Sequence, residues 1–453
     1  MIRSCLLAVA LFAPAVAAPA ADVHEFELDN GMRVLVREDH RAPVVVSQVW
    51  YRVGSIDEHR GITGVSHVLE HMMFKGTDEL GPGEFSEIIA RHGGSDNAFT
   101  GRGYTAYFQT IAAEHLELCL RLEADRMVDL QMAPEEFERE ARVVREERRQ
   151  RVEDNPRALT WERMRAAAFP SSPTRNPIIG WPADLESMRL ADLEHWYQRY
   201  YGPDNATLVV VGDVDPEEVH RLAKAHFGPL EPSGVPTKPT EVELEPRGEV
   251  RLRVHAPATL PYLTMGWRVP SLTTAERRRD VYALDVLRGV LDGGRSARIE
   301  TRVVRGEQVA ASAAASYSPL ARGDVLFSIS GTPADGREVA ALEAALREEV
   351  ERLESGEITQ AELERVKTNV RAQDVFQRDS MFYQAMRIGM LATVGLEQDA
   401  HDAYQAGIQE VTVDDVARVA REYLTDRRLT VAELVPEGVE TASAGAEGDS
   451  NAH

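Results

Sequence analysis

Residues 206–219 read ATLVVVGDVDPEEV, and residues 428–440 read RLTVAELVPEGVE. Each stretch has the residues of a strand, then a turn and then an acidic segment. A pattern that returns after about 200 residues indicates a faint internal duplication. We therefore expect the chain to consist of two similar halves.

Between these two stretches the sequence predicts further strands and helices. Residues 25–40 and 44–55 have the alternation and turn signals of strands. Residues 60–74 are expected to be helical, and residues 113–154 are expected to form two long helices. Four prolines without apolar periodicity mark residues 230–248 as the best linker candidate.

These signals divide the chain into five predicted segments. The end of the chain is rich in Ala, Gly, Ser and acidic residues, a composition typical of disorder. The predicted segments are a signal peptide at residues 1–20, an N-terminal domain at 21–230, a linker at 231–248, a C-terminal domain at 249–437 and a disordered tail at 438–453.

Composition and the N-terminus limit the class of protein. Of the 453 residues, 43% are hydrophobic and 28% charged, as in a soluble globular protein. The net charge of −23 disfavours nucleic-acid binding, and by itself would favour cationic substrates. Arg3 followed by an apolar run at 6–16 indicates a secretory signal peptide. No later run reaches about 18 apolar residues, so we expect no membrane span and a periplasmic or secreted protein.

Residues 67–74 read HVLEHMMF and suggest a metal site. In a helix, His67 and His71 share one face, and both can reach one Zn²⁺. Glu70 sits beside that position, where it can act as a general base. Exposed surface histidines are the alternative interpretation, but the neighbouring residues are apolar, and buried polar groups need partners.

A third ligand must come from elsewhere in the chain, and the second long helix offers two candidates. Glu140 and Glu147 are seven residues apart on one helix face, and Val143 and Val144 between them suggest that this face is turned inward. Without His67 and His71, an exposed charged helix would be the better interpretation of this segment.

These residues resemble the inverted H-x-x-E-H zinc motif of the pitrilysin-type (M16) metallopeptidases, and among them the short-chain subfamily that resembles the mitochondrial processing peptidase. The resemblance covers nearly the whole mature chain. Its further motifs are Gly93-Gly94, Asn97-Ala98-Phe99-Thr100, Tyr107, Glu140 with Val143-Val144 and Glu147, Arg175-Asn176-Pro177, Gly180, Tyr200-Tyr201-Gly202-Pro203-Asp204-Asn205 and Val210-Val211-Gly212-Asp213.

The resemblance implies an α+β fold of two similar halves, each a mainly antiparallel sheet packed with helices. It implies one Zn²⁺ per chain on His67, His71 and Glu147, with Glu70 as general base. Glu140 would belong to the same catalytic group, as a carboxylate behind the ligands that orients them.

Asn97 and Ala98 would lie on an edge strand that binds the peptide substrate. In the family, two chains of this length, or four halves in one chain, enclose a chamber.

One departure from the family pattern concerns the C-terminal half. Active members carry an Arg and a Tyr seven residues apart that hold the substrate backbone. Here Val304 and Ala311 stand at those positions, and Arg305 is one place off. Together with the predicted signal peptide, the resemblance and this departure from it predict an exported zinc endopeptidase that needs a related partner chain. A self-sufficient homodimeric peptidase is the alternative hypothesis, and a non-catalytic assembly subunit is a third hypothesis.

Overall fold

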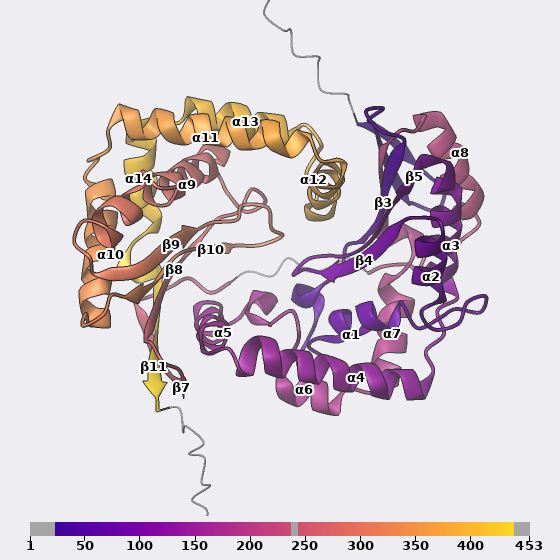
Figure 1. Ribbon diagram of the computed structural model, residues 1–453, viewed down its shortest axis with the longest axis horizontal. Coiled ribbons are helices and arrows are strands. Elements are labelled where there is room, and N and C mark those ends of the chain that lie inside the picture. The colour runs from indigo at the N-terminus through magenta and orange to yellow at the C-terminus, as the bar shows by residue number, and fades with distance from the viewer. Residues whose placement is uncertain (1–22, 237–242, 439–453) are drawn as a thin grey trace, which may run out of the picture.

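The computed structural model describes residues 23–236 and 243–438, which form two β-sheets with helices around them (Figure 1). The predicted signal peptide, residues 237–242 of the predicted linker and residues 439–453 of the predicted tail lie outside the described residues. The predicted domain boundaries stay predictions.

The first sheet has six strands in the order β1-β2-β6-β3-β5-β4, and the second has five in the order β7-β11-β8-β10-β9. The first comprises β1 (His24–Glu27), β2 (Arg33–Glu38), β3 (Val44–Tyr51), β4 (Ser95–Thr100), β5 (Thr105–Ala112) and β6 (Ala206–Gly212). The second comprises β7 (Val250–Pro257), β8 (Tyr262–Val269), β9 (Ala310–Ser316), β10 (Val325–Pro333) and β11 (Leu429–Glu437).

The two sheets repeat one topology. Strand β6 enters between β2 and β3, parallel to the former and antiparallel to the latter. Strand β11 enters between β7 and β8 in the same two senses. The stretches at 206–219 and 428–440 therefore supply equivalent strands, which confirms the predicted duplication. The other neighbouring strands pair antiparallel, so the predicted α+β fold of two similar halves is confirmed as well.

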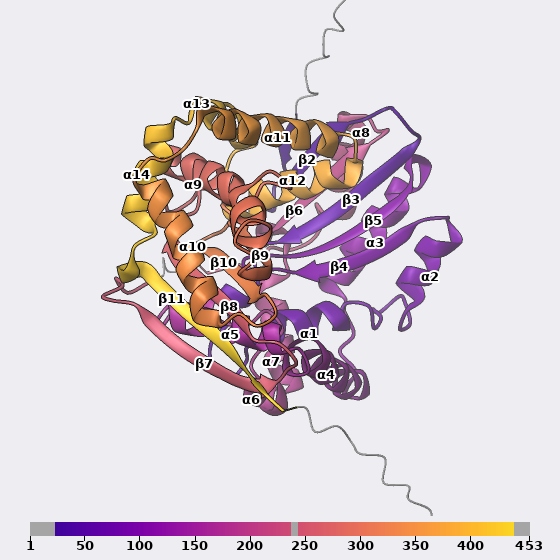
Figure 2. The same ribbon diagram turned by 60° about the vertical axis from the view of Figure 1, so that its left-hand side comes forward.

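Helices surround both sheets (Figure 2). Those before the predicted linker are α1 (Val65–Met72), α2 (Glu84–Arg91), α3 (Leu116–Val128), α4 (Pro134–Arg148), α5 (Pro156–Ala168), α6 (Pro182–Ser187), α7 (Leu190–Tyr200) and α8 (Pro216–His226). Those after it are α9 (Arg278–Leu291), α10 (Val339–Glu354), α11 (Gln360–Arg378), α12 (Met381–Val394), α13 (Ala400–Glu410) and α14 (Val413–Tyr423). None of these described helices is long and apolar enough to cross a membrane.

The central strands are apolar on both faces because both faces are covered. In β6, Leu208 and Val210 belong to the main core of the first half, whereas Val209 and Val211 belong to a second cluster on the opposite face. Because both faces of the strand are buried, its sequence is a continuous apolar run and does not alternate between apolar and polar residues. The single cysteine of the predicted mature chain, Cys119, is fully buried in the first core, as predicted.

Each half lends one helix to the sheet of the other half. Helix α12 packs on β3 and β6 of the first sheet, and α5 packs on β8 and β11 of the second (Figure 1). The fit is close: a Cβ added at Gly389 of α12 would lie 2.1 Å from Cε2 of Trp50. The two halves are thus joined by reciprocal helix–sheet packing.

Candidate metal centre

Helix α1 carries His67, Glu70 and His71, and it begins at Val65 rather than at residue 60 as predicted. Gly64, the residue before the helix, has a left-handed φ of 89°, so the helical conformation cannot extend back beyond Val65. Glu58, only 2% exposed, accepts hydrogen bonds from the backbone N–H groups of Gly64 at 2.7 Å and Ser66 at 3.0 Å. This buried carboxylate satisfies N–H groups at the start of the helix that have no partner within it.

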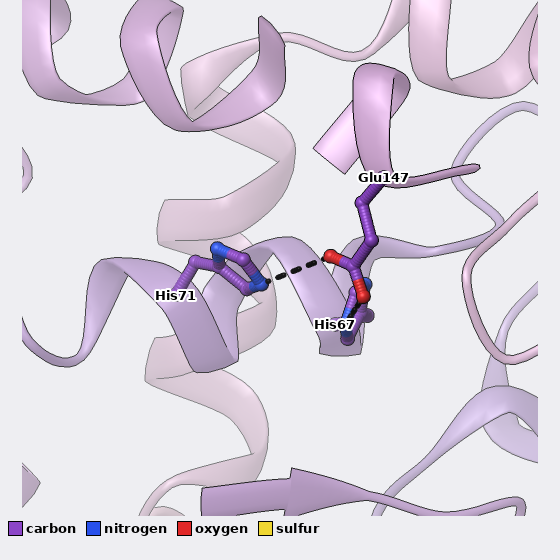
Figure 3. A group of neighbouring side chains, drawn as sticks. All are labelled: His67, His71 and Glu147. Carbon is purple, nitrogen blue, oxygen red and sulfur yellow. Dashed lines mark ion pairs between the residues drawn. The ribbon is translucent and has the colours of Figure 1, made fainter. Parts of the chain in front are cut away.

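Glu147, in the last turn of α4, meets both histidines (Figure 3). Its Oε1 lies 3.8 Å from His67 Nε2, and its Oε2 lies 3.5 Å from His71 Nε2. One ligand atom from each of the three residues lies within 4.8 Å of the others. Tertiary packing of α1 against α4 therefore brings together the three predicted ligands.

Glu140 lies two turns earlier on α4 and contacts His71 from the other side. Its Oε2 is 3.1 Å from His71 Nδ1, and its Oε1 is 2.8 Å from Lys75 Nζ. The bond to Nδ1 holds the ring with Nε2 toward Glu147. This geometry suits a carboxylate that orients a ligand rather than one that binds the metal itself.

The prediction that Val143 and Val144 both mark an inward face was half wrong. Val144 is fully buried, but Val143 is 44% exposed. Positions 140, 144 and 147 follow one stripe of the helix, whereas residue 143 lies about 100° from its neighbour 144. Of the two valines, only Val144 therefore lies on the inward stripe that carries Glu140 and Glu147.

Two further contacts involve the acidic groups of the site. The Thr100 hydroxyl, at the end of β4, donates a hydrogen bond to Glu70. Arg151, in the π-helical turn Arg149–Glu153 after α4, lies 2.6 Å from Glu147 Oε1. Glu70 thus has one fixed oxygen, and Glu147 is shared between the histidines and an arginine.

Burial sets the ionisation of the site. It lowers the pKa of His67 to about 4 and raises the pKa of Glu70 above its usual value. For His71, burial alone would lower the pKa, but the bonds from Glu147 and Glu140 outweigh it and raise the pKa. The bond from His71 lowers the pKa of Glu147. A neutral His67 beside an ionised Glu147 is the state in which both groups can donate lone pairs to a cation.

The donor set fits a zinc ion. Zinc ligands at about 2.0–2.1 Å in tetrahedral geometry lie about 3.3 Å from one another. His67 Nε2 and His71 Nε2 lie 3.8 and 3.5 Å from the two different oxygens of Glu147, and one ligand atom from each residue lies within 4.8 Å of the others, so the side chains must draw closer together to reach that value. His67 Nδ1 is buried without a hydrogen-bond partner among the described residues, so the only polar contact of the ring is that of Nε2 with Glu147. Two histidines and one carboxylate also leave a fourth position open, as in catalytic zinc sites.

The group opens into a cavity of about 680 Å³ that is also lined by Asn97 and Ala98. Both residues lie on β4, the edge strand of the first sheet. The hydrogen bond from Gly101 N to Tyr104 O closes the β4–β5 hairpin, so alternate residues of β4 bond to β5 and Ala98 directs its N–H and C=O outward. In agreement, Asn97 Oδ1 accepts a hydrogen bond from the Ala98 N–H at 2.8 Å. Strand addition at this edge would displace that side chain.

At the positions of the expected Arg–Tyr pair, the second half presents apolar side chains. Val304 packs against the second core, and Ala311 is exposed on β9. Arg305 lies 3.1 Å from Glu300 and also donates to the carbonyl oxygen of Arg295. Arg305 is therefore already engaged within its own half.

Sequence reasoning missed the supporting residues of the site. Lys75 follows His71 by four residues, a spacing that could have suggested its place on the same side. Thr100 was part of a recognised motif but had no assigned role. Arg151 follows Glu147 by four residues, so the same spacing could have suggested their contact, whereas Glu58 reaches the start of α1 across a loop and has no such signal.

Fold and site together define a protein of two similar α+β halves in which, among the described residues, only the first half holds a group able to bind a metal ion. The description "Insulinase (Peptidase family M16)" matches residues 33–181, and "Peptidase M16 inactive domain" matches residues 187–370. The zinc protease PqqE of Helicobacter pylori is 33% identical over 416 residues, which cover 90% of this chain and 92% of that protein. The uncharacterized zinc protease YmxG of Bacillus subtilis is 27% identical, over 89% of this chain and 96% of that protein.

Solved structures share the fold. The crystal structure of a protease from Helicobacter pylori superposes with a TM-score of 0.86 at 30% identity and covers 92% of this chain and 100% of that chain. The periplasmic protease PqqL from Escherichia coli matches with a TM-score of 0.75 at 19% identity, over 93% of this chain and 48% of that chain. This chain belongs to the M16 peptidase family. Its finer resemblance to the mitochondrial processing peptidase stays a prediction.

Proposed function

We propose that this chain is an exported zinc-dependent endopeptidase that hydrolyses peptides or unfolded polypeptides and holds one Zn²⁺. The observation that carries the proposal is the convergence of His67, His71 and Glu147 beside Glu70, in one cavity with an edge strand. The names of relatives such as the zinc protease PqqE support the same chemistry.

When bound, Zn²⁺ supplies Lewis acidity toward the peptide carbonyl and lowers the pKa of water. Glu70 takes a proton from the attacking water and returns it to the nitrogen of the leaving amine. Its raised pKa helps it to hold that proton between the two transfers. Thr100 keeps the carboxylate in place, and Glu140 keeps His71 turned toward Glu147.

Asn97 and Ala98 would receive the substrate as an added strand. The outward N–H and C=O of Ala98 can pair with the backbone of an extended peptide, which gives affinity with little dependence on side chains. Such a mode suits unfolded chains, because a folded protein has few free extended segments.

We propose further that a related chain completes the site. Val304 and Ala311 offer neither a cation nor a hydroxyl, and Arg305 is bonded within its own half. A heterodimer partner would supply the Arg–Tyr pair that the family uses to hold the substrate. The alternative is a self-sufficient homodimer in which another residue replaces the pair.

A non-catalytic assembly subunit is the third candidate. Loss of metal ligands would be expected of such a subunit, and here all three are retained. Export rests on the predicted signal peptide, which lies outside the described residues. The predicted location is the periplasm or the medium.

The test is cleavage of a quenched fluorescent peptide library by the purified mature chain, together with its zinc content. EDTA and Glu70→Gln are the controls, and Glu146→Gln, an exposed carboxylate on α4, is the matched substitution. Chelator-sensitive cleavage that is lost in Glu70→Gln but kept in Glu146→Gln would support a self-sufficient peptidase.

Bound zinc without cleavage would indicate a missing partner chain. Failure to bind zinc would contradict the whole proposal. Glu70→Gln should keep its zinc, so loss of the metal in that variant would refute the role assigned to Glu70.

A further inference from the structure

Three arginines line the metal cavity without a carboxylate partner among the described residues. They come from three segments: Arg102 follows β4, Arg165 lies on α5, and Arg175 lies in the 3₁₀ turn Pro173–Arg175. Arg102 donates to the backbone carbonyls of Thr174 at 3.0 Å and Asn176 at 2.7 Å. Arg175 donates to the backbone carbonyl of Pro170 at 2.9 Å. These acceptors are neutral and leave the charge of each guanidinium uncompensated.

Arg165 is the most isolated of the three. Its guanidinium lies 5.8 Å from the ring centre of Trp161 and 5.9 Å from that of Phe169. Its Nε is buried without a hydrogen-bond partner within the described part of the chain. Burial lowers the pKa of Arg165 to about 10 and that of Arg102 well below its usual value. An arginine side chain stays protonated at neutral pH, and no carboxylate among the described residues pairs with either of these two cations.

Two of the three acidic residues of the same cavity are already paired with an arginine. Glu147 lies 2.6 Å from Arg151, whereas Glu70 accepts a hydrogen bond only from the neutral Thr100 hydroxyl. Glu162 makes two bonds of 2.9 Å to Arg148, which does not line the cavity. The cavity thus has a surplus of positive charge, although the chain as a whole carries −23. The net charge of the chain alone would favour cationic substrates, but the local charge of this cavity does not.

The arginines lie where an extended peptide would pass. Residues 158, 161, 162 and 165 of α5 all line the cavity at helical spacing, so the helix presents one continuous face to it. That face is about 10 Å long, the length of about three residues of extended peptide. The same cavity is lined by Ala98 and Thr100 of β4 and by Arg102, two residues beyond the end of that strand. A peptide added to β4 would therefore reach Arg102 and Arg165 a few residues from the bond that is cleaved.

We propose that the metal cavity contains a carboxylate-binding subsite, formed by Arg165 and Arg102 with Arg175 at its side, and that the preferred substrates are acidic peptides. The carboxylate is an Asp or Glu side chain, or the C-terminal carboxylate of the peptide. This inference rests on the proposed function and specifies its substrate class. A bidentate carboxylate would supply the anion that the arginines lack.

Binding and cleavage test the subsite separately. The zinc-loaded Glu70→Gln protein is titrated with fluorescent peptides of neutral residues that carry one Glu or one Gln at each position in turn. Each peptide is made with a free and with an amidated C-terminus. A charge-assisted contact should tighten binding about tenfold to a hundredfold for the Glu peptide at one or two adjacent positions, or for the free terminus. The preference should disappear when Arg165→Met is added.

Arg163→Met is the matched control, because Arg163 lies exposed on the same helix beside Trp181 and outside the cavity. It should keep the preference. Arg165→Glu should reverse it in favour of a Lys peptide, which keeps the test valid if Arg165→Met folds poorly. A preference confined to internal Glu, or to free termini, supports the proposal and identifies the source of the carboxylate. Equal binding of all peptides would overturn it.

The two proposals fail in different ways. Wild-type protein that cleaves Glu and Gln peptides with equal kcat/KM would keep the proposed function and overturn the subsite. Acidic peptides that bind in an Arg165-dependent manner, but are never cleaved even with related chains present, would support the subsite and contradict the peptidase.

Discussion

Replacing Glu140 with Gln tests whether the site is organised as the geometry suggests. Glu140 uses one oxygen for His71 Nδ1 and the other for Lys75 Nζ, at 3.1 and 2.8 Å. A glutamine has one acceptor oxygen, so Glu140→Gln keeps one of these contacts at most and removes the charge. The His71 ring then loses part of what holds its Nε2 toward Glu147.

The expected loss is in metal affinity rather than in folding. Removal of a carboxylate that orients a metal-binding histidine weakens binding about tenfold to a hundredfold, or by about 1.4–2.7 kcal/mol. The side chain of Glu140 is only 6% exposed, so solvent screening reduces this effect little. Lys75 is 25% exposed and can turn toward water, so it adds little to the cost.

The assay is a competition titration of zinc against a chromophoric chelator at pH 7.5, with circular dichroism to verify the fold. Glu146→Gln is the control, since it removes an exposed carboxylate, 51% accessible, from the same helix. A zinc affinity of Glu140→Gln within twofold of wild type would refute the role given to Glu140. Equal losses in both variants would point to a general electrostatic effect instead.

Three further outcomes follow from the structure. His67→Ala should abolish tight zinc binding and the rise in Tm that zinc produces, which calorimetry with and without EDTA would detect. Gly389→Ala should destabilise the chain by about 1–3 kcal/mol in urea unfolding, because its Cβ would lie 2.1 Å from the Trp50 ring, and a stabilised variant would contradict the packing. Burial raises the pKa of Glu58 from 4.5 to about 7, so its ionisation should lower stability as pH rises through that interval. Relative to Glu58→Gln, wild type should therefore lose about 3 kcal/mol between pH 4.5 and pH 8, and a flat difference would contradict this.

The parts of the site that sequence could predict are local or belong to a recognisable motif. His67, Glu70 and His71 lie within five residues, and helical geometry alone puts them together. Glu147 was reached through the family resemblance, since the residues alone left Glu140 and Glu147 both open. The structure separates the two by distance: Glu147 meets both histidine Nε2 atoms, whereas Glu140 meets His71 Nδ1.

What sequence could not predict depends on tertiary contacts. The start of α1 is set by Gly64 and Glu58, and the second of these acts across a loop. The exchange of α5 and α12 between the sheets has no local signal, because nothing in the residues of either helix indicates which of the two sheets it will contact. The presence of Arg102 and Arg165 in one cavity could not be predicted from sequence either, because the two residues are 63 positions apart.

The exchange of helices also explains why a site made of first-half residues needs the second half. Helix α5 lines the metal cavity through Trp161 and Arg165, while Met164 and Ala168 on its other side pack against the second sheet. Their partners there include Leu326 of β10. The wall that faces the substrate is therefore held by strands that contribute nothing to the metal group. Among the described residues the second half has no metal-binding group of its own, yet its sheet is required to position α5, so the metal cavity depends on both halves.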